Sequence, residues 1–522
     1  MLPQNITGDE KHACDSRSGE LYKMSRSLDN TNSQPSLKKN AALNMMRTVM
    51  SLIFPLITFP YTSRVLGPVY IGKVNFAQSV VSYFSLVAAL GISTYAVREA
   101  AKIRNDRARL SKFIKEMLSL NLVSMGVAYI LLAAAVFLVP QLSEYRKLLC
   151  ISGASILFTT LGIDYLYTAL EEFRYITVRS IAFQILSLAL LFIFVRSQDD
   201  YLKYAAISVV SSAGSNVLNF LHSRKFVDFR LVMGAGVELR KHLRPIFTLF
   251  AMSAAVSIYT VLDTTMLGFL KGDEAVGIYT AATKINRMVV MMITAATGVL
   301  LPRLSYYANR GERTEFLRLS NKAVQFVVLF SVPCAAGLFV LSEPAVLLFS
   351  GSRYLPAVPV MKIMNAVIVF ISISNAIGIQ IFMSVGKERA TLFSVVAGSV
   401  VNFTFNMVLI PRYGAVGAAI GTVAAEFTVT AVQLAFAGEY LSCRTFIQHS
   451  VKVVLASLAM SFCVFAECIV FKSFTLKIIF GIFLGAASYA LCLFLLKDSL
   501  FAELSEQLTG RFYKKIKNKE AG

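Results

Sequence analysis

Charged side chains are scarce in this sequence, and acidic ones are the scarcer kind. Only 16% of the 522 residues are charged, with 30 acidic against 51 basic side chains, whereas a soluble protein normally has about 25%. Seven scattered cysteines show no spacing typical of a metal site or a disulfide framework. Four histidines lie at or outside the ends of apolar runs, so no histidine relay is expected within them. With no acid–base pair or histidine motif either, we predict that the chain is not an enzyme, which argues against a membrane-embedded glycosyl- or acyltransferase.

Long apolar runs are what the sequence has in abundance. Hydrophobic residues make up 56% of the chain and the mean hydropathy is +0.63. A helix needs roughly 20 apolar residues to cross ~30 Å of hydrocarbon. Runs of this length lie at about 43–63, 74–97, 117–139, 147–170, 175–196, 202–221, 245–269, 278–302, 322–349, 356–384, 390–410, 415–438, 446–471 and 476–496. They are continuous rather than alternating, which excludes a β-barrel. We predict an all-α polytopic membrane protein with about 14 transmembrane helices.

The basic residues are concentrated in alternate loops. The loops after the second, sixth and eighth runs and the C-terminal tail are rich in lysine and arginine, whereas the other loops hold one or two each, such as Arg146 and Lys147. Because lysine and arginine are retained on the cytoplasmic side, both termini are predicted to be cytoplasmic. The net charge of +21 therefore reflects membrane topology rather than a nucleic-acid partner.

The chain contains a weak internal repeat. Gly277 follows Gly72 by 205 residues in similar loops, and Arg389 follows Arg174 by 215. Six runs separate the copies, so the halves have the same orientation, as in transporters built from parallel repeats. We predict two pseudo-symmetric six-helix lobes around a central cavity, plus two C-terminal helices. The predicted parts are a disordered cytoplasmic tail (1–40, in which Met24 is an alternative start), an N-lobe (41–222), a linker (223–244), a C-lobe (245–440), two further spans (441–497) and a basic cytoplasmic tail (498–522).

Cations inside apolar runs are the first candidate site residues. Ionisable residues within a membrane span are expected to be functional. Arg47 and Arg64 lie in and just beyond the first run, and Lys284 and Arg287 share one helical face in the eighth. We expect all four to line the cavity from corresponding helices of the two lobes, where their charges suit phosphate oxygens. For Arg47 and Arg64, snorkelling to an interface is the structural alternative.

Acidic residues form a second group of candidates. Asp263 lies in the seventh run, and Asn402 and Asn406 are one helical turn apart in the eleventh. Together they are a candidate site for coupling to Na⁺ or H⁺, and the alternative is an ion pair between Asp263 and Lys284 or Arg287. The remaining intramembrane acids are Asp164, Glu426 and Glu467. No nucleotide motif is complete and no cofactor is predicted, so an ion gradient, the membrane potential or the substrate gradient must supply the energy.

Several segments resemble the polysaccharide flippases of the Wzx type. The resemblance lies in TSRVLGPVYIGKVNFAQSVVSYFSLVAALGISTYAVREAAKIRND (62–106), GIDYLYTALEEFRYITVRS (162–180), LDTTMLG followed by VGIYTAATKI (262–285) and LPRLS (301–305), and it extends over about residues 40–440. These flippases share a superfamily with multidrug/cation antiporters and the lipid II flippase. The family fold, two six-helix lobes plus two helices, agrees with the count of apolar runs.

The resemblance implies a function and site roles. The implied substrate is an oligosaccharide on a polyprenyl diphosphate, flipped from the cytoplasmic to the periplasmic leaflet of the bacterial inner membrane for O-antigen or capsule synthesis. Arg47, Lys284 and Arg287 match cavity cations that attract the diphosphate, and Asp263, Asn402 and Asn406 match a sodium site. In the lipid II flippase the last two spans form a groove for the lipid tail, from which Glu467 departs.

The alternatives are lipid II as substrate, and a drug or cation antiporter, which would call for an acidic cavity. A polysaccharide polymerase of the same pathway is a candidate partner. The sequence does not identify the sugars.

Overall fold

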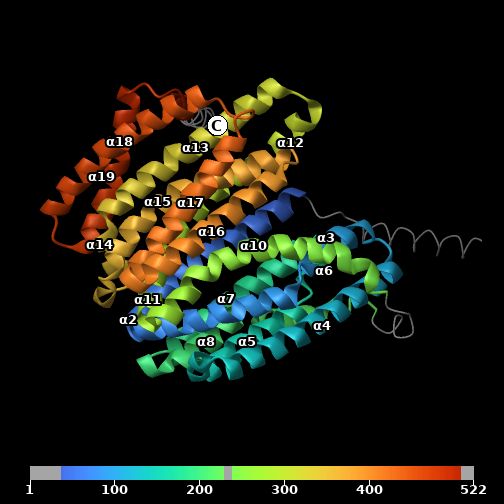
Figure 1. Cartoon of the computed structure of the whole chain (residues 1–522). Helices are drawn as coiled ribbons and strands as arrows, with labels where there is room; N and C mark the ends of the chain where they lie inside the picture. Colours follow the sequence, from blue (N-terminus) through green and yellow to red (C-terminus); the bar gives the residue numbers. More distant parts are fainter. Residues whose placement is uncertain (1–36, 229–237, 507–522) are drawn as a thin grey trace, which may run out of the picture.

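The computed structural model describes residues 37–228 and 238–506, and these residues are almost wholly helical, with no strand among them. Figure 1 shows long helices running side by side in two groups, with α2 to α9 in one, most of the later helices in the other, and α10 alongside the first. The predicted tail segments 1–36 and 507–522 and part of the predicted linker, 229–237, lie outside the described residues.

The helices have the following bounds. The first group comprises α2 (Leu37–Ala89), α3 (Ile92–Lys102), α4 (Arg107–Leu138), η1 (Pro140–Tyr145), α5 (Arg146–Leu161), α6 (Asp164–Ala169), α7 (Phe173–Phe194), η2 (Gln198–Asp200), α8 (Tyr201–Val209), η3 (Val210–Gly214) and α9 (Asn216–Ser223). The later helices are α10 (Arg240–Lys271), α11 (Asp273–Thr297), η4 (Gly298–Leu300), α12 (Leu301–Arg310), α13 (Arg313–Val340), α14 (Ser342–Phe349), η5 (Ser352–Tyr354), α15 (Ala357–Asn375), η6 (Ala376–Phe382), α16 (Glu388–Tyr413), α17 (Ala415–Phe436), α18 (Cys443–Val470) and α19 (Phe474–Leu495).

Eleven helices in the described part of the chain are long and apolar enough to cross a membrane. One of them, Val49–Lys102, contains the first two predicted spans in a single segment. The predicted spans 202–221 and 278–302 are not among the eleven. The first of these is divided into α8, η3 and α9, and the second, α11, carries Lys284 and Arg287 in its middle. The protein is thus a multi-pass membrane protein, and the number fourteen stays a prediction.

The internal repeat predicted from the sequence is visible in the backbone. Gly67 interrupts α2 at φ 75° and ψ 177°, and Gly272, 205 residues later, separates α10 from α11 at φ 81° and ψ −172°. This backbone region is open essentially to glycine alone. The second repeat pair behaves alike, because Glu171 before α7 and Gly386 before α16 both have positive φ, 60° and 72°. The halves of the chain therefore share local structure as well as sequence.

The two halves meet where α2 and α11 cross. A Cβ atom on Gly72 would lie 1.7 Å from the carbonyl oxygen of Asp273, and one on Gly277 would lie 1.9 Å from that of Pro68. The two contacts are related by the repeat, since 205 residues separate both Pro68 from Asp273 and Gly72 from Gly277. The repeated glycines thus allow the backbones of the two lobes to touch on a pseudo-two-fold axis.

We call the predicted cytoplasmic end the basic end and the opposite one the outer end. The lobes share a large core at the outer end, and at the basic end α10 packs in the core of the first lobe. At the outer end a single hydrophobic core joins both lobes, with Ile71 and Leu149 packed in one cluster with Val276 and Val360. At the basic end the cores are separate, one formed by α3, α4, α6 and the start of α10, the other by α13, α15, η6, α18 and α19. The lobes are therefore fastened together at the outer end.

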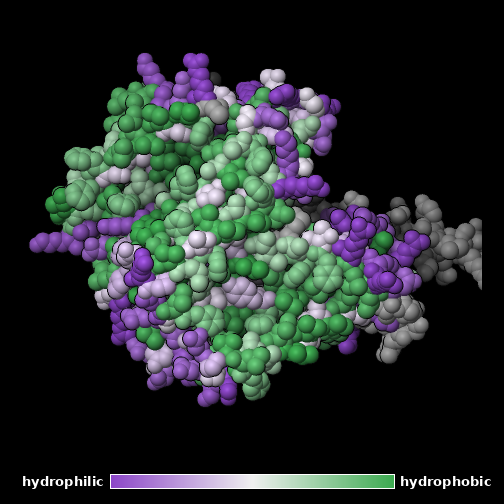
Figure 2. Space-filling view, viewed as in Figure 1, coloured by the Kyte–Doolittle hydropathy of each residue, from purple (hydrophilic) through white to green (hydrophobic). Residues whose placement is uncertain are grey.

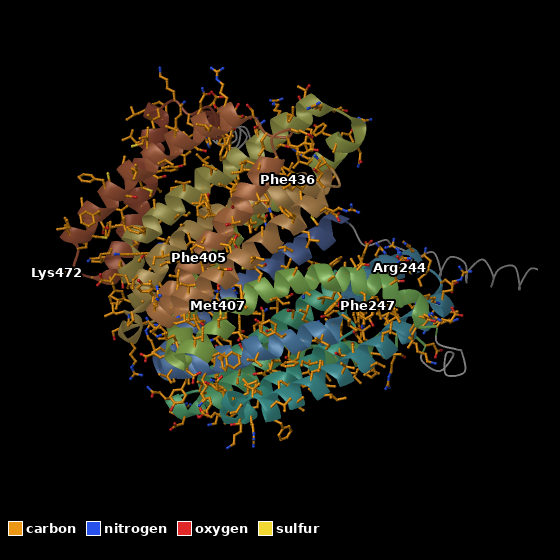
Figure 3. All side chains as sticks on the ribbon, viewed as in Figure 1. Arg244, Phe247, Phe405, Met407, Phe436 and Lys472 are labelled. Atoms are coloured by element: carbon orange, nitrogen blue, oxygen red, sulfur yellow. The ribbon has the colours of Figure 1, made fainter. Side chains whose placement is uncertain are left out.

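Apolar side chains cover the middle of the molecule. Figure 2 shows hydrophobic residues over much of the visible face, with hydrophilic ones gathered mainly toward its edges. In Figure 3, Arg244 and Lys472 lie at opposite ends of the helices, and Phe405, Met407 and Phe436 lie between, at 42%, 53% and 49% exposure. Such a band suits contact with lipid, because soluble monomeric proteins rarely expose large contiguous apolar patches.

Helices α18 and α19 form a hairpin on the second lobe, against α13 and α14. Its basic end is held by a buried polar contact, in which His449 Nδ1 lies 2.8 Å from Asp498 Oδ2 and Nε2 lies 3.0 Å from the carbonyl oxygen of Gln325. The predicted C-terminal tail is thus packed against the lobe over its first residues, as Glu503 also pairs with Lys322 at 2.7 Å.

Replacing Gly72 with alanine is expected to destabilise the protein, because the new methyl group would overlap the backbone of α11. Overpacking of this kind costs about 1–3 kcal/mol or more. The measurement is the Tm of the purified protein in detergent. Gly126→Ala in α4 is the matched control, since no atom lies within 4 Å of the added carbon. Equal melting temperatures for the two variants would contradict the tight crossing.

Candidate functional site

The structure brings Asp263, Asn402 and Asn406 together, as predicted from the sequence. The carboxylate of Asp263, on α10, is buried and accepts four hydrogen bonds. Two come from α16, from Asn402 Nδ2 at 2.9 Å and Asn406 Nδ2 at 2.6 Å. The other two come from hydroxyl groups, Tyr279 Oη at 2.6 Å and Thr422 Oγ1 at 2.7 Å. A carboxylate with four donors is stabilised in the membrane without a cationic partner.

The alternative for Asp263, an ion pair with Lys284 or Arg287, is wrong. In the described ranges neither cation forms an ion pair with any carboxylate. Lys284 Nζ instead lies 4.2 Å from the centroid of the Phe59 ring, and Arg287 Nη2 donates to the carbonyl oxygen of Thr260 at 3.4 Å. Two positive charges are thus present at membrane depth without anionic partners.

Sequence reasoning missed Tyr279 and Thr422. Neither residue type is unusual in a membrane helix, and their contact with Asp263 arises from three helices meeting. The glycine spacing in α17 could have indicated that this helix packs closely against α16, near Asn406. A Cβ atom on Gly421 would lie 2.3 Å from Asn406 Oδ1, and one on Gly417 would lie 2.3 Å from the carbonyl oxygen of Leu409. The four-residue glycine spacing therefore brings α17 close to α16.

Lys284 and Arg287 line a cavity of about 320 Å³ in the first lobe, which we call the N-lobe cavity. Its other walls come from α2, α7, α8 and η3. They are rich in hydroxyl and amide groups, contributed by Ser51, Thr58, Asn75, Gln78, Ser187, Tyr204, Ser208 and Ser211. Met291 continues the stripe of Lys284 and Arg287, as the helical spacing predicted. A small polar cavity with two uncompensated cations is suited to an anion.

The two arginines of α2 lie in different places. Arg47 is partly buried and precedes Ser51 by one helical turn, so it shares the face of α2 that lines the N-lobe cavity. Arg64 lies roughly 25 Å further along the helix. It is exposed, and its guanidinium donates to the carbonyl oxygens of Pro60 at 2.7 Å and Leu347 at 3.4 Å. The structure thus places Arg64 in the outer contact between the lobes, outside the N-lobe cavity.

The expected symmetry of the cations needs a correction. Applying the 205-residue offset, Lys284 and Arg287 correspond to Ser79 and Ser82 in the second half of α2. They do not correspond to arginines of the first span, because the first span is the counterpart of α10. The counterpart of Asp263 is Thr58, which lines the N-lobe cavity. The repeat therefore supplies equivalent positions in the two lobes, but with different charges.

The remaining acids Asp164 and Glu467 differ in burial, because the Asp164 side chain is 48% exposed whereas Glu467 is 6% exposed and its Oε1 has no hydrogen-bond partner. Asp164 Oδ1 accepts from Arg179 Nη2 at 3.2 Å and from the amide of Asn219. Arg179, which sequence reasoning did not single out, is 6% exposed. Glu467 Oε2 lies 3.7 Å from Cys468 Sγ, and a Cβ atom on Gly481 would lie 3.4 Å from the same oxygen. Asp164 and Arg179 thus form an internal pair of the first lobe.

Glu426 occupies a different setting. It is buried on α17, one turn beyond Thr422, and its Oε1 accepts a hydrogen bond of 2.7 Å from Tyr259 Oη on α10. Both residues line a cavity of about 760 Å³ in the second lobe, which we call the C-lobe cavity. Tyr259 likewise precedes Asp263 by one turn, so the Tyr259–Glu426 contact forms a layer next to the Asp263 cluster.

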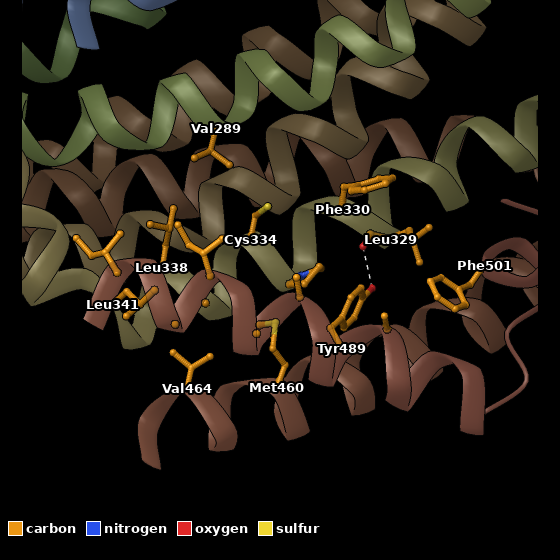
Figure 4. Close-up of a pocket in the computed structure, with 18 of the residues that line it drawn as sticks. Val289, Leu329, Phe330, Cys334, Leu338, Leu341, Met460, Val464, Tyr489 and Phe501 are labelled. Carbon is orange, nitrogen blue, oxygen red and sulfur yellow. Dashed lines mark hydrogen bonds between the residues drawn. The ribbon is translucent and has the colours of Figure 1, made fainter. Parts of the chain in front are cut away.

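An apolar groove of about 790 Å³ lies between α13, α18 and α19. Figure 4 shows Leu338, Leu341, Met460 and Val464 around it, and Tyr489, whose hydroxyl donates to the carbonyl oxygen of Leu329 at 2.8 Å. Glu467 is not among its lining residues, so the groove is apolar despite that acid. Its chemistry suits a hydrocarbon chain.

The fold and these cavities define a class of protein, a multi-pass helical membrane protein with two repeated lobes, the plan of secondary transporters. A family model described as "Polysaccharide biosynthesis protein" matches residues 37–308, just over half of the chain. The chain therefore belongs to the polysaccharide biosynthesis protein family. A second model, described as MatE, matches residues 249–408.

Relatives agree with this assignment, and two solved structures share the fold. The chain is 24% identical to the "Putative O-antigen transporter" of Escherichia coli K12, over 78% of this chain and 98% of that protein. It is 22% identical to the "Capsular polysaccharide biosynthesis protein CapF" of Staphylococcus aureus, over 74% and 96%. Its fold is similar to that of the "Lipid II flippase MurJ, inward closed conformation", with a TM-score of 0.70 and 17% identity over 88% of this chain and 99% of that one. An inward-facing MATE transporter gives a TM-score of 0.55 and 13% identity, over 78% and 95%.

A double-mutant cycle tests the assignment of Asp263. We expect a coupling free energy of about 1–3 kcal/mol between Asp263→Asn and Asn406→Leu, as for residues in one hydrogen-bond network. The coupling between Asp263→Asn and Lys284→Met should be smaller, because those side chains make no direct contact. The measurement is denaturant unfolding of the single and double variants in detergent micelles. A larger coupling with Lys284 would restore the ion-pair alternative.

Proposed function

We propose that this protein is a flippase for oligosaccharides linked to polyprenyl diphosphate. It moves them from the cytoplasmic to the periplasmic leaflet of the bacterial inner membrane during synthesis of cell-surface polysaccharide. The family match and the names of the relatives support the polysaccharide class. The observation that carries the proposal is that Lys284 and Arg287 line a cavity at membrane depth with no carboxylate partner in the described chain.

A bound diphosphate would offset the free-energy cost of placing Lys284 and Arg287 inside the membrane. A charged side chain at the centre of a bilayer costs at least ~2.5 kcal/mol on insertion scales. The charges of Lys284 and Arg287 have no carboxylate partner among residues 37–228 and 238–506, so a bound anion would stabilise them. A cationic substrate would be repelled by the same groups, which argues against a drug or cation antiporter. Arg47, at the basic end of the same helix face, would meet the diphosphate first.

The fastening of the lobes supports the direction of transport. At the outer end Tyr145 Oη donates to Asp273 Oδ1 at 2.7 Å, and Ser63 and Arg64 donate to α14 across the lobes. These contacts and the shared core close the outer end, whereas at the basic end each lobe has its own core and α10 packs in that of the first lobe. The substrate would therefore enter at the cytoplasmic side, and rocking of one lobe on the other would release it outside.

In this proposal the apolar groove binds the prenyl chain of the substrate. Its walls between α13 and the α18–α19 hairpin offer apolar surface, so the prenyl chain would remain in a hydrocarbon-like setting. The polar head group would cross through the interior of the lobes, because dragging unpaired hydroxyl groups through lipid is costly. An amphipathic lipid requires both an apolar site for its chain and a polar path for its head group.

Neutralising the cavity cations should reduce export. We expect Lys284→Ala and Arg287→Ala each to lower surface polysaccharide at least about 10-fold, because each loses a charge-assisted contact worth roughly 1.5–3 kcal/mol. Arg47→Ala should act in the same direction, and Lys284→Glu should be worse than Lys284→Ala. The measurement is surface polysaccharide in cells that express each variant at the normal level.

Lys362→Ala is the matched control, because this lysine lies 5.6 Å from the ring of Phe339 but lines neither the N-lobe nor the C-lobe cavity. Normal export by the Arg47, Lys284 and Arg287 variants would end the cationic-cavity proposal.

The Asp263 cluster is the proposed site of ion coupling. It offers oxygen atoms from one carboxylate, two amides and two hydroxyls, which suits a hard monovalent cation. Asn406 Oδ1 is buried without a hydrogen-bond partner, so one acceptor of the cluster is already free. Because α10 carries Asp263 and also packs through Ile246 in the basic-end core of the first lobe, a cation at Asp263 would act on the helix between the lobes.

Asp263→Asn should uncouple transport from the ion gradient. In proteoliposomes with lipid-linked oligosaccharide, we expect transport by the unaltered protein to rise several-fold with an imposed Na⁺ or proton gradient. The variant should lose this response, since it lacks the only carboxylate of the cluster. Transport driven by the substrate gradient alone is the control. A variant that still responds to the gradient would exclude Asp263 as the coupling site.

A further inference from the structure

The C-lobe cavity has no role in the proposal so far. It lies between α10, α15, η6, α16 and α17 and has a volume of about 760 Å³. Sites for small molecules typically have volumes of ~300–1,000 Å³. Many of its lining residues carry hydroxyl, amide or carboxyl groups, among them Ser257, Tyr259, Asn375, Thr391, Glu426 and Gln433. Polar groups at this density are not needed for packing in a membrane.

Two buried acceptors face this cavity on one side of α17. Glu426 and Gln433 are seven residues apart, so they share a helical face, and both are nine-tenths or more buried. Glu426 accepts one hydrogen bond, from Tyr259, and forms no ion pair within the described ranges. Gln433 donates from Nε2 to Ser394 Oγ at 3.0 Å, but its Oε1 has no partner. A buried acceptor without a donor is costly, so a donor from a ligand would fit both positions.

The C-lobe cavity differs in charge from the N-lobe cavity and touches it. The N-lobe cavity has two cations, whereas the C-lobe cavity has Glu426 in its wall and Glu388 near the basic end. Arg287 lines the first cavity, and its guanidinium donates to the carbonyl oxygen of Thr260, which lines the second. One elongated ligand could therefore occupy both, with its anionic part held away from Glu426 by like-charge repulsion.

We propose that the C-lobe cavity is the subsite for the sugars nearest the diphosphate of the lipid-linked substrate. This rests on the proposed function, in which Lys284 and Arg287 hold the diphosphate. Sugar hydroxyls donate and accept hydrogen bonds, so they match Glu426 and Gln433 as acceptors and Asn375 as a donor. The opposite charges of the two cavities fix the orientation of the substrate, with phosphate on α11 and sugar on α17.

Binding of two lipids that differ by one sugar tests the proposal. The probes are polyprenyl diphosphate and polyprenyl diphosphate N-acetylglucosamine, titrated into the full chain in nanodiscs. We expect the unaltered protein to bind the sugar-bearing lipid more tightly. Gln433→Leu and Glu426→Gln should each weaken binding of that lipid roughly 3- to 10-fold, the effect of one hydrogen bond. They should leave binding of the sugar-free lipid unchanged.

Gln380→Leu is the matched control, because Gln380 is a buried glutamine with an unpartnered Oε1 that does not line the C-lobe cavity. Melting temperatures show whether each variant is folded, and the conservative Glu426→Gln change provides the test if Gln433→Leu is not. Equal affinity of the unaltered protein for the two probes would overturn the proposal, as would variants that weaken both probes or neither. Lys284→Ala should weaken both probes, and if it weakens neither, the proposed function itself fails.

Discussion

The constraint on which the rest depends is the cost of charge inside a membrane. Asp263 has its charge stabilised by two amides and two hydroxyls. Since these neutral donors suffice, no lysine or arginine is consumed in pairing with it. Lys284 and Arg287 are thereby left with a ring and a carbonyl group as partners. In the proposed function, this arrangement separates the site of ion coupling at Asp263 from the site of the diphosphate at Lys284 and Arg287.

The crossing of α2 and α11 decides where these sites lie. Gly72 and Gly277 allow the backbones to touch, and a shared core surrounds that contact at the outer end. From the crossing, α11 runs inward for two turns before Lys284 appears, which places the cations in mid-membrane rather than at an interface. In the proposed function, a rocking motion would open the end opposite the shared core, and the substrate would reach the cavities from there.

The two copies of the repeat carry different side chains at equivalent positions. Thr58 in the first lobe occupies the position of Asp263 in the second, and by the 215-residue offset Ser187 occupies that of Asn402. Both counterparts line the N-lobe cavity. Equivalent positions of the two lobes therefore carry different side chains, a carboxylate at Asp263 in one lobe and a hydroxyl at Thr58 in the other. In the proposed function, the different charges of the two cavities would hold a substrate with an anionic and a neutral polar part in one orientation.

Much of this protein could be predicted from the sequence, because apolar length, loop charge and glycine spacing are local properties. They determined the helical membrane fold, the repeat, and the candidates Asp263, Asn402, Asn406, Lys284 and Arg287. Contacts between distant helices are not local, and only the tertiary structure decided them. Only the tertiary structure shows that Tyr279 and Thr422 donate hydrogen bonds to Asp263. It also places Arg64 in the outer contact between the lobes and pairs Asp164 with Arg179. Which charge is paired within the protein and which is left for a ligand depends on contacts between distant helices, because a hydrogen bond or a contact ion pair forms only between atoms within about 4 Å of each other.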